Sequence, residues 1–105
     1  MQTEVSILHH DYPARLREVV ETKLQALQKF YERVHSMRAM LERQKEEHRV
    51  ELVANVGKGS VLVVDARGSA LEAALDEAAD RMGRLLRRHN QKLTHERRRI
   101  GREGH

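Results

Sequence analysis

The feature of this sequence that most restricts its fold is a β-hairpin pattern in residues 48–66. From His48 to Val56, apolar side chains alternate with mostly polar ones, which is the period of a strand with one buried face. The segment Gly57-Lys58-Gly59 follows, and its glycines allow the backbone angles of a tight hairpin turn. Residues 61–66 form the returning strand, and the apolar run of residues 61–64 predicts a strand that is central or covered on both faces. Part of the core must therefore lie on an antiparallel sheet.

Four further segments surround this hairpin. Residues 3–9 and 37–43 alternate with a period of two and predict strands. Apolar residues at helical spacing predict one helix over residues 13–33 and another from about Leu71 to Leu93. The predicted order of elements is therefore β-α-β-β-β-α.

This order predicts an α+β fold. A strand–helix–strand crossover favours parallel pairing of the first two strands, whereas the short later turns favour antiparallel pairing. Each helix has one apolar stripe, so we expect a four-stranded sheet with two helices on one face. The length of 105 residues fits one domain. We expect this domain to span residues 1–93, and residues 94–105 to form a basic, disordered tail.

The charge of the chain narrows the choice of partner. Its formal net charge is +4. A basic domain is typical of proteins that bind nucleic acid, although a solvated basic surface without such a partner explains the charge equally well.

The bases gather in the second half of the second helix. Acids early and bases late stabilise any helix through its dipole, which explains their order but not the number of arginines. Between Arg81 and Arg102 the only acid is Glu96. Several of these bases recur three or four residues apart and share a face, and a row of guanidinium groups without paired acids is typical of phosphate recognition. The candidate contacts from this row are Arg81, Arg84, Arg87, Arg88 and Lys92.

Lys58, at the tip of the predicted hairpin, is a further candidate contact. A solvated lysine in a turn is an equally good interpretation of this residue.

Other kinds of chemistry have little support in the sequence. There is no cysteine, so no thiolate can bind a metal. Of the seven histidines only His9 and His10 are adjacent in sequence, and neighbouring residues of a strand point to opposite faces, so these two cannot share a metal ion. We therefore expect no metal, no cofactor, no small-molecule substrate and no enzymatic activity. No segment approaches the ~18 apolar residues of a membrane span, and no secretory signal is present, so we expect a cytoplasmic protein. The strands offer no aromatic platform for bases, so RNA binding would depend on phosphate contacts and RNA shape.

Several segments in this order resemble the short form of the ribosome hibernation promoting factor and ribosome-associated inhibitor family. The resemblance covers nearly all of residues 1–93. The segments that carry it are Leu16-Arg17-Glu18, Lys23, Phe30-Tyr31-Glu32-Arg33, the hairpin at Gly57-Lys58-Gly59, Ala73-Ala74-Leu75-Asp76, and Arg84-Leu85-Leu86-Arg87-Arg88-His89-Asn90-Gln91-Lys92-Leu93.

The resemblance implies the same β-α-β-β-β-α fold, similar in shape to double-stranded RNA-binding domains. It implies binding to the small ribosomal subunit and its rRNA, over the mRNA channel and the tRNA sites, which inhibits translation in stress or stationary phase. Family members often have an aromatic residue where this chain has Leu71, and this departure leaves a contact from that position open. The chain lacks the second, dimer-forming domain of the long form, and we expect a monomer off the ribosome. By position, the implied RNA contacts are Lys23, Arg81, Arg84, Arg87, Arg88 and Lys92.

Two alternatives remain open from the sequence. One is a generic double-stranded RNA-binding protein, which would bind free duplex RNA as well as it binds small subunits. The other is an interaction module for a transcription or signalling protein, whose binding would be insensitive to salt and nuclease.

Overall fold

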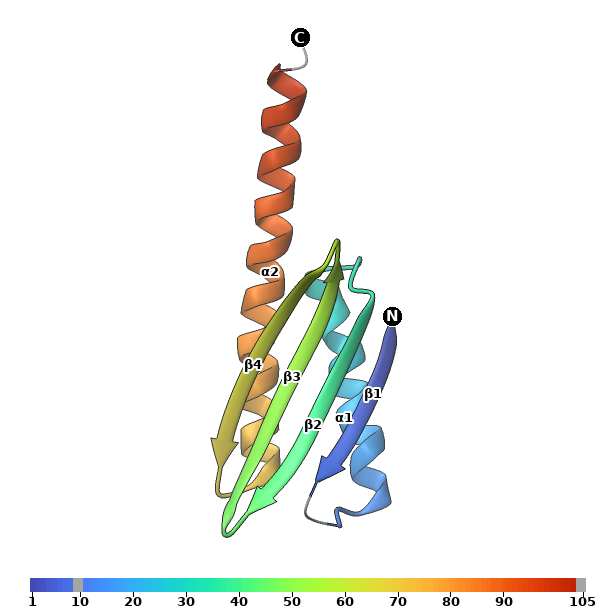
Figure 1. The fold of residues 1–105 in the computed structure, drawn as a ribbon, viewed down its shortest axis with the longest axis vertical. Coiled ribbons are helices and arrows are strands. Elements are labelled where there is room, and N and C mark those ends of the chain that lie inside the picture. The colour runs from blue at the N-terminus through green and yellow to red at the C-terminus, as the bar shows by residue number, and fades with distance from the viewer. Residues whose placement is uncertain (9–10, 104–105) are drawn as a thin grey trace.

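The fold is a four-stranded sheet with two helices on one of its faces (Figure 1). The computed structural model describes residues 1–8 and 11–103, with side chains described as far as His95. The elements are, in chain order, β1 (Gln2–Leu8), α1 (Ala14–Ala26), a 3-10 helix η1 (Leu27–Phe30), β2 (Ser36–Gln44), β3 (Glu47–Gly57), β4 (Ser60–Gly68) and α2 (Leu71–Glu103). The predicted α+β class and element order are confirmed, with η1 as an added short turn.

The strands lie side by side in chain order, β1-β2-β3-β4. β1 pairs with β2 in parallel, as the crossover through α1 predicts, and the other two pairs are antiparallel. Figure 1 shows both helices behind the sheet, with α2 beneath β3 and β4 and α1 beneath β1 and β2. One face of the sheet is therefore covered, and the other, which we call the open face, is exposed to solvent.

Strand alternation places the core on the covered face. The register aligns Val5, Ala39, Leu52 and Val64 across the four strands, and all four are buried. The helices add buried residues at helical spacing. These are Val20 and Leu24 from α1, and Leu71, Ala74, Leu75, Ala78, Met82 and Leu86 from α2.

The position of β4 differs from the prediction. β4 is an edge strand, and the side chains of Val61 and Val63 are 52% and 54% exposed on the open face. A continuous apolar run does not distinguish a strand covered on both faces from an edge strand whose open face carries valines.

Two helix ends also differ from the prediction. The first helix was expected to continue to Arg33, but α1 ends at Ala26, η1 follows, and Tyr31 is already extended. The second helix was expected to end near Leu93, but α2 continues to Glu103. Residues 94–103 are therefore helical in the structure, whereas we expected disorder. Residues 104 and 105 lie outside the described residues, and so does His9, the predicted end of the first strand. The division at residue 93 remains a prediction.

Candidate nucleic-acid interface

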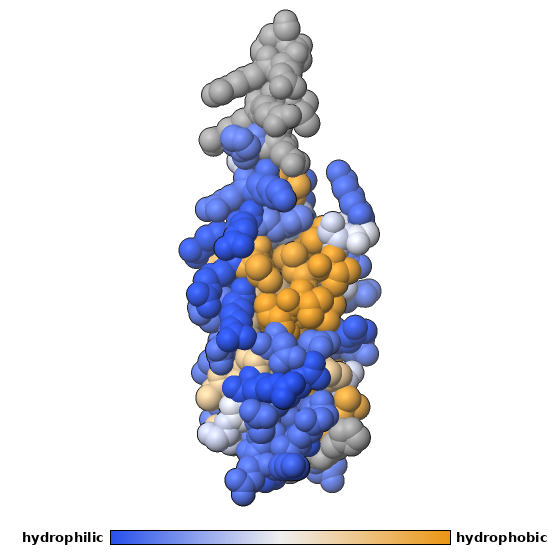
Figure 2. All heavy atoms as spheres, turned by 60° about the vertical axis from the view of Figure 1, so that its left-hand side comes forward, coloured by the Kyte–Doolittle hydropathy of each residue, from blue (hydrophilic) through white to orange (hydrophobic). Residues whose placement is uncertain are grey.

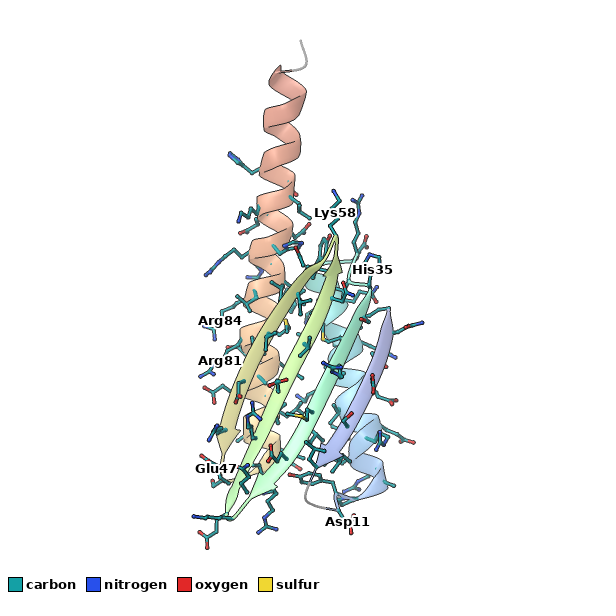
Figure 3. All side chains as sticks on the ribbon, viewed as in Figure 1. Asp11, His35, Glu47, Lys58, Arg81 and Arg84 are labelled. Carbon is teal, nitrogen blue, oxygen red and sulfur yellow. The ribbon has the colours of Figure 1, made fainter. Side chains whose placement is uncertain are left out.

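The predicted arginine row lies on exposed surface of α2, and its members differ in their contacts. Arg81 pairs with Glu77 at 2.6 Å and also donates to the backbone carbonyl oxygen of Asp65 on β4 at 2.6 Å. Arg84 pairs with Asp80 at 2.9 Å. Figure 3 shows Arg81 and Arg84 on the same side of α2, at the left of this view. The expectation of a row without paired acids is therefore wrong for these two residues, because their partners lie one turn earlier on the helix.

Lys23 is also paired within the protein. Its Nζ donates to Asp76, which links α1 to α2. The side chains of Lys23 and Asp76 are 41% and 62% exposed, so the pair contributes at most about 1 kcal/mol to stability. Phosphate oxygens could replace the carboxylates that pair with Lys23, Arg81 and Arg84 at a small cost in free energy. In the protein alone, however, these three bases are occupied by acids.

A second set of bases lies at the end of the sheet where β3 turns into β4. Figure 1 shows that α1 ends there and that α2 passes the hairpin. Among the described side chains, no carboxylate lies within ion-pairing distance of any of them. We call this set the basic end; it consists of Lys29, Arg33, Lys58, Arg87, Arg88 and Lys92.

The hairpin turn places Lys58 at the tip of the basic end (Figure 3). Lys58 and Gly59 both have positive φ angles, 54° and 76°, as a two-residue hairpin loop of the primed type requires. The amide of Gly57 donates to Asn55 Oδ1 at 3.0 Å, which steadies the turn. The backbone therefore presents the Lys58 ammonium group to solvent.

Lys29 and Arg33 belong to the basic end but were not among the predicted contacts. The sequence placed both on a single long helix, whereas the chain turns at η1 and brings them beside α2. Without that turn, no residue pattern relates them to Arg87. One signal in the sequence could have identified Arg33, because Arg33 lies in the segment Phe30-Tyr31-Glu32-Arg33 that carries the family resemblance.

The open face has a different character. Arg49 lies among three carboxylates, at 2.6 Å from Asp65, 3.0 Å from Glu51 and 3.5 Å from Glu42. The hydrogen bond to Asp65 raises the pKa of Arg49 above its ordinary value, so the guanidinium stays charged. One base with three acids makes this cluster net negative, which disfavours contact with phosphates.

An apolar patch lies next to this cluster. Figure 2 shows it beside the polar surface of α2. It includes the exposed Val61 and Val63 of β4, and the half-buried Val53 lies opposite Val63 on β3. Of these two surfaces, the basic end therefore has the charge that favours a polyanion, and the cluster around Arg49 does not.

Residues that suggested other chemistry have structural roles. His48 accepts or donates a hydrogen bond with the Tyr12 hydroxyl at 2.7 Å, and His89 meets the Tyr31 ring edge-on at 5.0 Å between centroids. Among the described side chains, which end at His95, no three of metal-binding type lie together. Over residues 1–8 and 11–103, no helix is long and apolar enough to cross a membrane.

Comparison with known proteins places this fold. The chain is 30% identical over 93 residues to the ribosome hibernation promoting factor of Salmonella typhimurium, covering 89% of this chain and 97% of that protein. It is 29% identical over 92 residues to the protein of the same name from Azotobacter vinelandii, covering 88% and 85%.

Two solved structures share the fold. The N-terminal domain of Protein Y from Thermus thermophilus has a TM-score of 0.76 at 22% identity, covering 85% of this chain and 99% of that one. A ribosomal subunit interface protein from Coxiella burnetii has a TM-score of 0.78 at 18% identity, covering 87% and 99%. The family model described as Sigma 54 modulation protein / S30EA ribosomal protein matches residues 3–94. The chain therefore belongs to the Sigma 54 modulation protein / S30EA ribosomal protein family.

Proposed function

We propose that this protein is a ribosome hibernation factor of the cytoplasm. It binds the rRNA of the small ribosomal subunit over the mRNA channel and the tRNA sites, and it inhibits translation during stress or stationary phase by occupying them. Family membership over residues 3–94 and relatives named ribosome hibernation promoting factor support this function. The mode of action is occupancy, without catalytic turnover.

The observation that carries the proposal is the basic end. Its bases come from η1 and the segment that follows it, from the β3–β4 hairpin and from α2, and no described carboxylate neutralises them. Guanidinium groups donate in-plane hydrogen bonds that match phosphate oxygens, and ammonium groups act as point charges. Because these parts of the chain pack together, the backbone positions that carry the bases have fixed separations, so the surface favours RNA whose phosphates are folded to match. A ribosomal subunit offers such a folded surface, whereas a regular duplex offers only one spacing.

A sedimentation experiment tests this function. Purified protein is mixed with small subunits, large subunits or free duplex RNA, and bound protein is measured in sucrose gradients at several salt concentrations. We expect co-sedimentation with small subunits and none with large subunits. Equal binding to large subunits contradicts the proposal, and equal affinity for free duplex RNA supports the alternative of a generic double-stranded RNA-binding protein.

Two variants of equal charge change locate the contact. Arg87→Glu with Arg88→Glu reverses two charges at the basic end. Arg15→Glu with Arg43→Glu reverses two exposed charges at the opposite end of the sheet. We expect only the first pair to abolish small-subunit binding and relieve the inhibition of translation in a purified system. Equal effects of the two pairs would mean that net charge alone, and not the basic end, controls binding.

A further inference from the structure

The side chain of Phe30 joins two of the bases in the basic end. The Lys29 Nζ and the Arg87 Cζ each lie 5.1 Å from the centre of the Phe30 ring. Lys29 comes from η1 and Arg87 from α2, so the ring holds two cations from different elements. At this distance a cation is attracted by the negative face of an aromatic ring.

Gly83 allows the ring to lie in this position. A Cβ atom at residue 83 would lie 2.9 Å from Phe30 Cε2 and 3.2 Å from Cδ2, closer than side-chain carbons normally approach. The helix surface is therefore flat where the ring packs. Arg87 follows one turn later on the same side of α2, which brings its guanidinium group over the ring.

Next to Phe30 lies a notch of about 370 Å³ between η1 and α2. Asn90, one further turn along α2, forms part of its wall. Glu32 is the one carboxylate among the lining residues, against the two bases Lys29 and Arg33, and Arg87 adds a third positive charge over the Phe30 ring. The residues that line the notch are Lys29, Phe30, Tyr31, Glu32, Arg33 and Asn90.

We propose that this notch binds a phosphodiester group of the RNA backbone, and that Phe30 is the residue that positions Lys29 and Arg87 for it. A guanidinium group stacked on an aromatic ring keeps its in-plane N–H donors free for phosphate oxygens. Stacking also restricts the rotamers of both long side chains before RNA arrives, so binding orders fewer groups. The proposal rests on the function proposed above, assigns Lys29, Arg33 and Arg87 of the basic end to one phosphate, and adds Asn90 to the contacts.

A mutant cycle tests the positioning role. Phe30→Leu keeps an apolar side chain against Gly83 but removes the face of the aromatic ring. We therefore expect about a fivefold loss of small-subunit affinity. The same change in a background with Lys29→Gln and Arg87→Gln should cause no further loss, because no cation remains to be positioned. Phe30→Tyr keeps the ring and should bind as the wild type does. A merely structural role would lower affinity equally in both backgrounds, and that result overturns the proposal.

A second variant addresses packing without altering the ring or the charges. Gly83→Ala forces the ring to move, so affinity should fall while both cations remain.

Each protein is also measured by thermal melting and against free duplex RNA. If the wild type binds duplex RNA but not small subunits, the hibernation function is contradicted and the notch proposal is not. If the Phe30→Leu variant binds small subunits as tightly as the wild type, the notch proposal alone is contradicted. If the wild type binds neither partner, both proposals are contradicted.

Discussion

At the scale of single residues, the carboxylates of α2 determine which arginines are free to bind. Arg84 shares its charge with Asp80, four residues earlier, whereas Arg88 has Arg84 at that position. The side chains of Arg84 and Asp80 are 66% and 71% exposed, so the pair itself contributes about 0.3–0.5 kcal/mol. Two arginines on neighbouring turns therefore have different capacities for phosphate.

Matched neutral variants measure this difference. Arg88→Gln should weaken RNA binding and lower the salt dependence of the logarithm of affinity by about 0.9, the value of one phosphate contact on a duplex. Arg84→Gln should have a smaller effect, because the wild-type side chain must first leave Asp80. Asp80→Asn should strengthen binding by releasing Arg84. Salt titrations of all three variants check these expectations, and identical losses for Arg84→Gln and Arg88→Gln would contradict them.

Tyr12 gives a residue-scale prediction of pH dependence. Burial raises the pKa of its hydroxyl above 10.0, the value for the unfolded chain. Because the folded protein favours the neutral form, the contribution of this group to stability is fully present below pH 10.0 and is lost as pH rises through the raised value. The unfolding free energy should therefore fall less steeply in alkaline solution for Tyr12→Phe than for the wild type. Denaturant melts across that pH range make the comparison, and parallel curves would contradict the prediction.

At the scale of elements, sequence patterns predicted burial better than they predicted element ends. The periods of Val50, Leu52 and Ala54 and of Leu71, Leu75 and Met82 correctly identified a strand and a helix, because burial imposes those periods. α2 continues beyond Leu93, where its apolar period stops, because arginine and glutamate favour a helix without burial. Val61 and Val63 led to an error of the other kind, because their apolar side chains predicted a covered strand although both are exposed.

The candidate site was predictable in part for the same reason. Helical spacing alone placed Arg81, Arg84 and Arg88 on exposed helix surface. The acids that neutralise Arg81 and Arg84 were also within reach of the sequence, since each precedes its arginine by four residues. The contact between Phe30 and Arg87 was not, because it depends on the turn at η1 and on the space left by Gly83.

Truncation tests the extension of α2. Removal of residues 94–105 deletes four arginines and no residue of the described core. We expect the melting temperature to stay within a few degrees of the wild type and small-subunit binding to weaken. Calorimetry and gradient sedimentation measure the two effects. A large loss of thermal stability would show instead that this part of the helix supports the core.

At the scale of the whole molecule, charge varies along the length of the protein. The molecule extends 59 × 21 × 21 Å, with α2 alone about 50 Å long. The basic end lies where α2 passes the sheet, whereas Arg81 and Arg84 on the middle of α2 and Arg49 on the open face are paired with acids. The unneutralised charge is therefore displaced from the middle of the molecule.

This displacement gives the molecule a dipole that turns it before contact. In the field of a polyanion, the protein would rotate until its basic end faces the RNA, so a larger share of encounters is productive. Added salt should then slow association more than it speeds dissociation, in stopped-flow or surface measurements on small subunits. Reversal of charge at Arg87 and Arg88 should remove most of that sensitivity, whereas reversal at Arg15 and Arg43 should retain it. An association rate that is indifferent to salt would mean that the protein arrives in random orientation.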